Sequence, residues 1–277
     1  MTTQMTANCE SCPAFNRAMV KKLGINADDA DYVVALAGNP NTGKSTVFNA
    51  LTGLRQHVGN WPGKTVARAE GGFSFNERKY RLVDLPGTYS LLSTSTDEEI
   101  ARDFILFGRP DVTVVVVDAT RLERNLNLAL QILEITGRVV IALNLIDEAQ
   151  RHGIRVDERH LSRKLGVPVV PMAARRGIGI PELLQTIELV ATGKYRPTPY
   201  RIQQRDPKVE TAVSRLVGVL ESEFPGLPNA RWVALRLLDG DVSVEQAIRD
   251  RTLGDLGFPK AEAVPAGEFI QLEVANA

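Results

Sequence analysis

Residues 38–45, with the sequence GNPNTGKS, constrain the fold more than any other part of the chain. They match the pattern Gly-x-x-x-x-Gly-Lys-Ser/Thr in full. The apolar run at residues 32–37 predicts a buried strand before them, and residues 46–54 place apolar side chains at helical spacing after them. In such a strand–loop–helix unit, backbone N–H groups and the helix N-terminus hold phosphate oxygens. The stretch therefore predicts a nucleotide-phosphate site.

Two side chains of this loop have expected chemical roles. Lys44 is expected to reach the β- and γ-phosphates, and the Ser45 hydroxyl to bind Mg²⁺. The alternative is a glycine turn followed by a chance Lys-Ser pair, but the flanking strand and helix favour the phosphate site. The residues expected to hold the nucleotide here are Gly38, Asn39, Pro40, Asn41, Thr42, Gly43, Lys44, Ser45 and Thr46.

Composition argues against several other classes of protein. Lys plus Arg and Asp plus Glu number 33 each among 277 residues, so no net field attracts nucleic acid or anionic lipid. Apolar runs such as residues 112–117 are too short to span a bilayer. Residues 1–31 lack the apolar core of a signal peptide. The chain as given is expected to be a cytoplasmic, soluble protein or fragment of one or two domains.

Cys9 and Cys12 are the only cysteines and form a Cys-x-x-Cys pair. A redox or metal role needs a thioredoxin-like setting or a second pair of ligands, and the sequence offers neither. We expect an unliganded pair on an N-terminal extension at residues 1–30. Metal binding and contact with another chain remain the alternatives.

A second motif follows a predicted loop and hairpin. Residues 55–68 contain several breakers and are expected to form a loop that carries Thr65. Residues 70–75 and 78–83 alternate as two antiparallel strands joined at Asn76-Glu77. The second strand ends in Asp84, Leu85, Pro86 and Gly87.

This Asp-Leu-Pro-Gly sequence suits a nucleotide site. Asp84 is expected to hold Mg²⁺ through water, and the Gly87 N–H to approach the γ-phosphate. Leu85 and Pro86 complete this group of nucleotide-binding residues. An isolated Asp-x-x-Gly sequence is also found in strand-to-loop turns that have no role in binding. Here its distance after the phosphate loop favours the interpretation that it contacts the γ-phosphate.

A third motif, Asn144-Leu145-Ile146-Asp147, follows a strand predicted at residues 138–143. The Asp147 carboxylate can accept hydrogen bonds from the N1–H and the exocyclic amine of guanine, a pair of donors that adenine does not offer. Leu145 is expected to cover the face of the base. The pattern is weak when it stands alone, but here it occupies the base-specificity position of a GTPase. Met172, Ala173 and Ala174 are expected to back the base, and Arg175 and Arg176 to form a solvated charge pair.

Strands and helices alternate through residues 31–193. This alternation predicts an α/β phosphate-loop GTPase fold with a six-stranded, mostly parallel sheet and one antiparallel edge. Residues 194–277 change character and predict a small all-α domain and tail, with eleven basic and twelve acidic residues. The remaining strands are expected at residues 111–118 and 167–171, and the helices at residues 96–107, 125–136, 156–165, 177–190, 207–224, 229–238 and 243–253.

The ordered motifs resemble those of translation-factor-class small GTPases, and the segments between them narrow the resemblance. GNWPGKTV, DLPGTYSL, TDEEIARDFIL, NLNLALQILE and RWVALRLLDGD resemble the cytosolic N-terminal region of FeoB-type bacterial ferrous iron transporters over about residues 31–255. The last of these segments lies outside the predicted G domain, so it is not a general GTPase feature.

The resemblance implies a G domain that binds and hydrolyses GTP with Mg²⁺, and a helical domain that acts as a nucleotide-dissociation inhibitor. In the family, K⁺ stimulates hydrolysis and is held by the asparagine matching Asn41 and by backbone carbonyls matching Gly59 and Trp61. Thr88 stands where many GTPases place a water-orienting glutamine, and a cation near the phosphates would supply charge. Gly63, Lys64 and Thr65 are expected to close over the nucleotide.

The resemblance implies catalytic roles for several positions, and other positions depart from the family pattern. Thr65 would complete the Mg²⁺ shell, acting with Asn41, Lys44, Ser45 and Gly87. The departures are Lys64 in place of an apolar residue, Met172 in place of serine, and Leu145 in place of lysine. A hydrophobic residue in the last position is ordinary for this family.

The expected function is therefore a slowly hydrolysing GTP switch that controls Fe²⁺ uptake through a transmembrane region absent from this sequence. Its expected partners are guanine nucleotide, that permease region in the same or a partner chain, and small accessory proteins of iron uptake, with no nucleic acid. The full transporter would place it at the cytoplasmic face of the inner membrane, and homo-oligomerisation is left open.

Two other functions compete with this one. The first is an RNA-associated GTPase of ribosome assembly or tRNA modification, whose tail should be basic or carry an RNA-binding module. Gly254-Asp-Leu-Gly257 matches a bare KH-type loop, but it contains an acid. The second is a GTP-binding switch without turnover, which Thr88 in place of glutamine favours. A phosphotransferase kinase would leave Asn144, Asp147 and Thr65 without a role.

Overall fold

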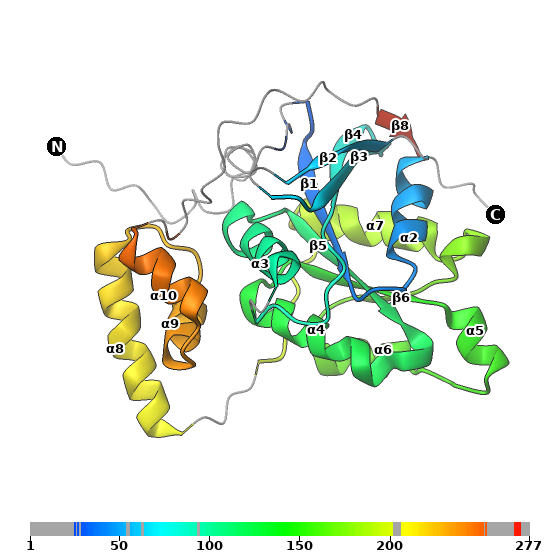
Figure 1. The fold of residues 1–277 in the computed structure, drawn as a ribbon. Helices are drawn as coiled ribbons and strands as arrows, with labels where there is room; N and C mark the ends of the chain where they lie inside the picture. The colour runs from blue at the N-terminus through cyan, green and yellow to red at the C-terminus, as the bar shows by residue number, and fades with distance from the viewer. Residues whose placement is uncertain are drawn as a thin grey trace.

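The computed structural model combines a layered α/β unit with a smaller helical unit (Figure 1). It describes residues 25, 27, 29–53, 56–61, 64–92, 95–201, 206–251, 253 and 269–272. Cys9, Cys12, Gly63 and the Gly-x-x-Gly sequence at residues 254–257 lie outside the described residues. Within the described part of the chain, every helix is too short or too polar to cross a lipid bilayer.

One sheet runs through the α/β unit in the strand order β2-β3-β4-β1-β5-β6-β7, with β8 paired to β3. Parallel pairing joins β4, β1, β5, β6 and β7, whereas β2, β3 and β4 form an antiparallel edge. This confirms the predicted fold class. The strands are β1 (Tyr32–Gly38), β2 (Gln56–Asn60), β3 (Ala67–Phe75), β4 (Arg78–Asp84), β5 (Val112–Asp118), β6 (Val139–Asn144), β7 (Val169–Pro171) and β8 (Phe269–Gln271).

The sheet has eight strands, so the predicted number of six was too low. β2 lies within residues 55–68, which we expected to form a loop, and β8 lies in the C-terminal tail. β2 has only one β-branched residue, Val58, and a glycine beside it, so its own sequence carries little strand pattern. It is held by antiparallel pairing with residues 67–71 of β3, and β8 pairs with the adjacent residues 72–74.

The hairpin of β3 and β4 turns at the predicted dipeptide. Asn76 and Glu77 have φ values of 48° and 62°. Two successive residues with positive φ form the type I′ turn, whose twist matches that of paired antiparallel strands. The hairpin register then places Ala69 opposite Asp84, at the edge of the sheet where β1 meets the phosphate loop.

Helices cover both faces of the sheet. α2 (Lys44–Thr52) and α7 (Ile180–Ala191) pack on one face through one apolar cluster. A second cluster joins the other face to α3 (Thr96–Asp103), the π-helix η2 (Phe104–Gly108), α4 (Leu122–Ile135) and α6 (Glu158–Leu165). The short α5 (Ile146–Arg151) follows β6. β5 is buried along its whole length because both of its faces are covered.

Capping residues set the helix starts that differ from the sequence prediction. α6 begins at Glu158 rather than 156 because the Asp157 side chain accepts a hydrogen bond from the His160 N–H at 2.8 Å. α7 begins at Ile180 rather than 177 because Gly179 has a φ of 82° and ends the preceding turn. These differences follow from local backbone geometry and leave the arrangement of layers unchanged.

The helical unit consists of α8 (Pro207–Glu223), α9 (Ala230–Leu238) and α10 (Val242–Arg249). It lies beside α3 and η2 (Figure 1). Arg102 of α3 donates to the Ser243 hydroxyl at 2.9 Å, and its guanidinium lies 3.9 Å from the Asp241 carboxylate. The Asn229 amide donates to the carbonyls of Glu134 and Ile135, both at 3.0 Å.

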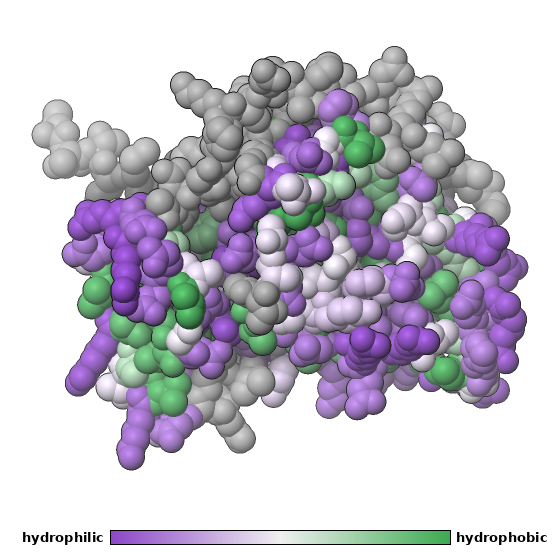
Figure 2. All heavy atoms as spheres, in the orientation of Figure 1, coloured by the Kyte–Doolittle hydropathy of each residue, from purple (hydrophilic) through white to green (hydrophobic). Residues whose placement is uncertain are grey.

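The face of the molecule in Figure 2 is largely hydrophilic, with hydrophobic residues gathered over the helical unit. Four of its apolar side chains are well exposed, namely Val209, Val219, Leu238 and Val242. Its inward side contributes Val213, Leu220 and Val233 to the cluster shared with the α/β unit. The helical unit therefore buries one apolar side against the α/β unit and leaves these four apolar side chains in solvent.

Replacing Asn229 with alanine is expected to loosen this docking. The change removes the helix cap, since the Asn229 side chain also accepts from the Trp232 N–H, and it removes both hydrogen bonds to residues 134 and 135. We expect the free energy of unfolding to fall by about 2–3 kcal/mol. Hydrogen exchange of the α9 amides would measure the loosening.

Asn229→Gly is the matched control for backbone strain, because residue 229 has a φ of 50° that glycine adopts freely. If the alanine variant kept wild-type exchange in α9, these hydrogen bonds would contribute nothing to docking.

Candidate nucleotide site

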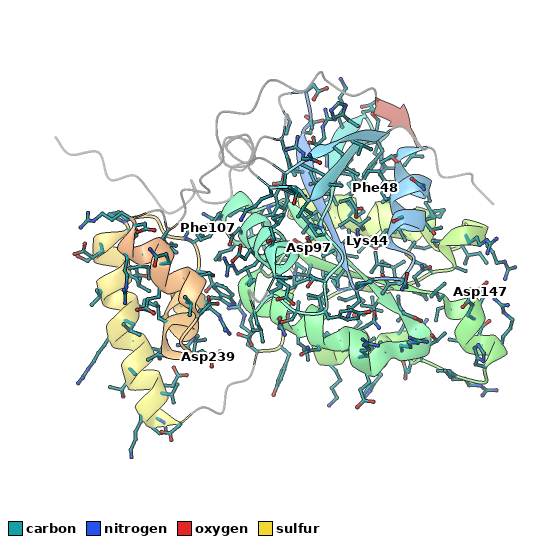
Figure 3. The ribbon with its side chains drawn as sticks, in the orientation of Figure 1. Lys44, Phe48, Asp97, Phe107, Asp147 and Asp239 are labelled. Carbon is teal, nitrogen blue, oxygen red and sulfur yellow. The ribbon has the colours of Figure 1, made fainter. Side chains whose placement is uncertain are left out.

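The phosphate loop connects β1 to α2 and presents its backbone to the expected nucleotide. Asn41 and Gly43 have positive φ, 64° and 83°, which curls the chain around the start of α2. No side chain caps α2, and its first turn contains no acidic residue. The N–H groups of that turn and the positive end of the helix dipole therefore suit a phosphate. Figure 3 shows Lys44 at the start of this helix.

Lys44 and Asp84 form a direct ion pair between the first turn of α2 and the end of β4. Both side chains are largely buried, and burial raises the pKa of the Asp84 carboxyl while the Lys44 ammonium opposes that shift. This pair joins two residues that the sequence assigned to phosphate and magnesium. When an Mg²⁺–nucleotide binds, Lys44 would contact phosphate and Asp84 would contact metal-bound water, so the direct ion pair between them would be replaced.

The loop after β4 lies against the phosphate loop. Leu85 N–H bonds to the Leu36 carbonyl at 2.9 Å, and a Cβ atom built on Gly87 would lie 3.6 Å from Pro40. The Thr88 hydroxyl donates to the Ser90 carbonyl at 2.7 Å and lies 3.5 Å from Glu98 Oε1. Gly87 thus lies against Pro40 of the phosphate loop, and the Thr88 hydroxyl is engaged within its own loop.

Asn144 ties the base-reading motif to the phosphate loop. Its amide donates to the Thr42 carbonyl at 3.0 Å, and its carbonyl oxygen accepts from the Ala174 N–H at 3.0 Å. The side chain is 1% exposed. A Cβ atom on Gly43 would lie only 2.3 Å from the Asn144 amide nitrogen, so this contact requires glycine. Three segments far apart in sequence are thereby fixed relative to one another.

The other base-motif residues surround this bridge. Leu145 has a φ of 61°, which starts α5 abruptly and places Asp147 in its first turn, labelled in Figure 3. Asp147 lies 3.7 Å from Arg151 and is partly exposed. Met172, Ala173 and Ala174 are buried in the loop after β7. The Met172 carbonyl accepts from the Ile146 N–H at 3.1 Å, which joins this loop to α5.

Lys64 and Thr65, which are expected to close over the nucleotide, lie between the antiparallel strands β2 and β3 instead. Trp61 N–H bonds to the Val66 carbonyl at 2.9 Å, and the Trp61 carbonyl accepts from Lys64 N–H at 3.0 Å. The Trp61 ring is buried edge-on against Phe104. Thr65 is exposed in the turn between β2 and β3, and Gly59 is part of β2. The Mg²⁺ and K⁺ roles of Gly59, Trp61 and Thr65 therefore stay predictions.

Two buried carboxylates near the site received no role from the sequence. Glu98 lies beside Thr88 in the first turn of α3, where the Ser95 hydroxyl accepts a hydrogen bond from the Glu98 N–H at 3.3 Å. The Ser-x-x-Glu spacing of a capping box could have revealed it. Asp118 ends β5 and accepts from the N–H and hydroxyl of Thr120, both at 2.7 Å. No motif identified that residue in advance.

A magnesium ion at this site would take its ligands from the nucleotide, from water and from Ser45, which is exposed at the start of α2. Among the described residues, no group of three or more His, Cys, Asp or Glu side chains forms a separate metal site. The donor set fits a hard oxygen-binding cation shared with phosphate.

The parallel sheet, the phosphate loop and the Asn144 bridge define a GTPase-type nucleotide-binding domain. The family described as "Ferrous iron transport protein B" matches residues 32–187, and the family described as "FeoB cytosolic helical domain" matches residues 206–264. The chain belongs to the FeoB family of ferrous iron transport proteins.

Individual relatives agree with this assignment. The Fe(2+) transporter FeoB of Escherichia coli strain K12 is 45% identical over 213 residues, and that of Salmonella typhimurium strain LT2 is 44% identical. Each alignment covers 76% of this chain but only 27% of the relative. The chain therefore spans about a quarter of the length of these transporters.

Solved structures of FeoB cytosolic domains are similar to this chain in three-dimensional fold as well as in sequence. The cytosolic domain of L. pneumophila FeoB superposes with a TM-score of 0.71 at 37% identity, covering 81% of this chain and 88% of that one. The cytosolic domain of the T. maritima FeoB iron transporter in GDP form II gives 0.72 at 39%, covering 83% and 88%. An S. thermophilus NFeoB E67A mutant bound to GDP gives 0.69 at 38%, covering 79% and 82%.

Proposed function

We propose that this chain binds guanine nucleotide and hydrolyses GTP with Mg²⁺. The Asn144 bridge carries the proposal, because it fixes the base-reading loop against the phosphate loop at a distance set by one buried side chain. GDP-bound structures of the T. maritima and S. thermophilus relatives support the choice of guanine. Asp147 would then accept from the guanine N1–H and amine, with Leu145 against the ring.

Hydrolysis would rest on charge stabilisation rather than on a single side-chain base. Lys44 and Mg²⁺, bound by Ser45, would neutralise charge that develops on the phosphates, and the Gly87 N–H would contact the γ-phosphate. The Thr88 hydroxyl already donates to Ser90, so it is poorly suited to orient the attacking water. A K⁺ ion held by Asn41 and by the carbonyls of Gly59 and Trp61 would add positive charge there.

Binding of GTP would also require the hairpin of β2 and β3 to open. Thr65 would have to leave its turn to reach Mg²⁺, and the Trp61 carbonyl would have to give up its bond to the Lys64 N–H. The closed and open hairpins would be the two states of the switch. α3 contacts the loop after β4 through Glu98 and the helical unit through Arg102, and the adjoining η2 contacts Trp61 through Phe104. α3 and η2 would therefore carry the change from the switch to the helical unit.

In the complete protein, we propose that this switch regulates Fe²⁺ uptake from the cytoplasmic face of the bacterial inner membrane. The matching relatives are Fe(2+) transporters of which this chain spans about a quarter. The partners would be the transmembrane permease region and small accessory proteins of iron uptake. Binding of RNA would instead favour the competing RNA-associated function.

Potassium is expected to raise GTP turnover at least about tenfold over sodium at equal ionic strength, because the ion adds charge beside the phosphates. Asn41→Gly should abolish the stimulation without backbone strain, since residue 41 has a φ of 64°. Phosphate release in matched K⁺ and Na⁺ buffers measures both rates.

Asn41→Asp is the matched control, because it keeps an oxygen ligand at the same reach and should retain most of the stimulation. Equal, very slow rates in the two salts with GTP still bound would contradict the K⁺ mechanism and favour a binding switch. A chain that bound no GTP would contradict the proposed function itself.

A further inference from the structure

The loop that contains Gly87 is held at both of its ends. At its start, the Leu85 N–H donates to the Leu36 carbonyl of β1 at 2.9 Å. At its far end, Leu91 is buried in the apolar cluster to which α4 also contributes. Gly87 therefore lies in a short span whose position depends on β1 at one end and on α4 at the other.

The side chain of Gln131 connects α4 to the far end of this loop. Its oxygen accepts a hydrogen bond from the Leu91 N–H at 2.7 Å and another from the Ser90 hydroxyl at 3.3 Å. The Ser90 hydroxyl in turn accepts from the Leu92 N–H at 3.1 Å. One side-chain oxygen thus organises three consecutive residues of the loop.

Arg124 adds a weaker contact from the same face of α4. It precedes Gln131 by seven residues, which is two helical turns, so both side chains point in the same direction. The Arg124 guanidinium lies 4.5 Å from the centre of the Tyr89 ring, within the range of cation–π attraction. Arg124 and Tyr89 are both exposed, and such contacts are weaker in solvent. Gln131 is therefore the stronger of the two supports.

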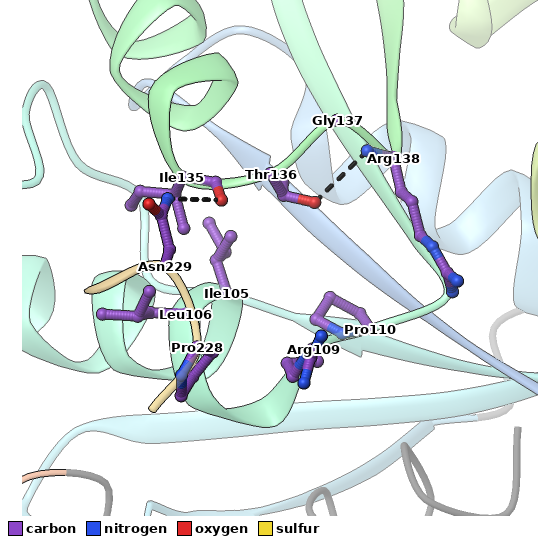
Figure 4. Close-up of a pocket in the computed structure, with 10 residues that line it drawn as sticks. All are labelled: Ile105, Leu106, Arg109, Pro110, Ile135, Thr136, Gly137, Arg138, Pro228 and Asn229. Atoms are coloured by element: carbon purple, nitrogen blue, oxygen red, sulfur yellow. Dashed lines mark hydrogen bonds between the residues drawn. The ribbon is translucent and has the colours of Figure 1, made fainter. Parts of the chain in front are cut away.

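α4 is itself fixed at both ends, which makes it a rigid support for the loop. Near its start, the Asn125 side-chain oxygen accepts from the Asp118 N–H at 3.4 Å. At its end, the Asn229 amide of the helical unit donates to the Ile135 carbonyl, as Figure 4 shows. The inward face of the helix packs in the apolar cluster between these ends. The position of Gln131 is thus set independently of the loop that it holds.

We propose that Gln131 is a positioning residue for the γ-phosphate of GTP. Through the Leu91 N–H it holds the loop so that the Gly87 N–H is placed to contact that phosphate, and it acts through the loop rather than on the nucleotide itself. The proposal rests on the proposed binding of GTP. GDP has no γ-phosphate, so the support from Gln131 matters for GTP and not for GDP.

Gln131→Met tests this role, because methionine has a similar length but lacks a strong acceptor for the Leu91 N–H. The affinity for a non-hydrolysable GTP analogue, divided by the affinity for GDP, is expected to fall at least about fivefold. The kcat for GTP should fall at least about tenfold, since small displacements of a positioning group slow the reaction strongly. The dissociation constant of GDP should change less than twofold. Titrations with fluorescent nucleotides in Mg²⁺ buffer and phosphate release measure these values.

Two further variants separate positioning from general damage. Gln131→Glu keeps an acceptor for the Leu91 N–H and should retain at least about half of the wild-type affinity ratio. Gln185→Met makes the same change as Gln131→Met at an exposed position of α7, on the other face of the sheet, and should leave the ratio unchanged. Equal losses of analogue and GDP affinity in Gln131→Met would show a merely structural role. An unchanged or higher ratio would show that the loop is not held for the γ-phosphate, and either result would overturn the proposal.

Hydrogen exchange of the Leu91 amide tests the support without any nucleotide. Exchange should be faster in Gln131→Met and unchanged in Gln185→Met, because only the first loses the acceptor. Wild-type exchange in Gln131→Met would overturn the proposal. A wild-type chain that bound both nucleotides without turnover would contradict GTP hydrolysis alone, and the affinity ratio would still test Gln131. A wild-type chain that bound neither nucleotide would contradict the proposed function.

Discussion

Replacing Asp84 with asparagine is expected to lower Mg²⁺-dependent GTP turnover by about two to three orders of magnitude, while affinity for GDP without Mg²⁺ stays the same or rises. The structure gives the reason for both effects. The Asp84 carboxylate would orient the metal-bound water, and it also holds the Lys44 ammonium in an ion pair. Asparagine loses the metal role and releases Lys44 for the phosphates.

The same substitution is expected to leave stability at neutral pH unchanged or slightly higher. Burial raises the folded-state pKa of Asp84 above its unfolded value of 3.8, with Lys44 opposing the shift. Its contribution to stability is therefore present below the unfolded pKa and is lost as pH rises through the folded pKa. Neutral asparagine removes the cost of burying that charge.

Single-turnover hydrolysis and fluorescent-GDP binding, each with Mg²⁺ or with a chelator, measure these effects. Lys44→Ala should differ by losing nucleotide affinity under both conditions, because the phosphate partner itself is gone. Asp239→Asn changes a 65% exposed carboxylate in the helical unit and should leave turnover unchanged. Wild-type Mg²⁺ dependence in Asp84→Asn would show that this carboxylate does not serve the metal.

Replacing Asn144 with alanine is expected to lower the free energy of unfolding by about 2–4 kcal/mol and nucleotide affinity by at least about a hundredfold. The side chain is buried and satisfies the Thr42 carbonyl and the Ala174 N–H at once. Alanine leaves both backbone groups without those partners. It also frees the loop after β7 to move away from the base.

Urea unfolding with and without GDP measures the two effects separately. Asn144→Asp keeps the shape and the acceptor for Ala174 but turns the donor toward Thr42 into an acceptor, so it should be at least as damaging. Gly43→Ala is an independent test, because its Cβ would displace the Asn144 amide. An unfolding free energy within about 0.5 kcal/mol of wild type for Asn144→Ala would exclude a bridging role.

The phosphate loop is a feature that a local sequence pattern can predict. The conformation of this segment depends on interactions between residues close together in the chain. One pattern of glycines, a lysine and flanking apolar runs therefore predicted β1, the loop and the start of α2 together. The turn at Asn76-Glu77 was predictable for the same reason. The segment at residues 55–68 shows the limit, because β2 has little strand pattern of its own and depends on pairing with β3.

The contacts that organise the site also lie beyond sequence patterns. Glu98 could have been found through its capping box, but its position beside Thr88 could not. Gln131 is an ordinary polar residue of a helix in sequence, and only the packing of α4 beside the loop after β4 brings its side chain to the Leu91 N–H.

The sequence by itself determined the class of fold, the order of the three nucleotide motifs and the family resemblance, since each rests on residues close together in the chain. Only the tertiary structure decided that Asn144 reaches Thr42 across 102 positions, that Lys44 meets Asp84 across 40, and that residues 56–60 form a strand. These arrangements arise because each segment satisfies its polar groups or buries its side chains against distant partners. The periodicity of a short stretch of sequence does not indicate which distant segment will be its partner.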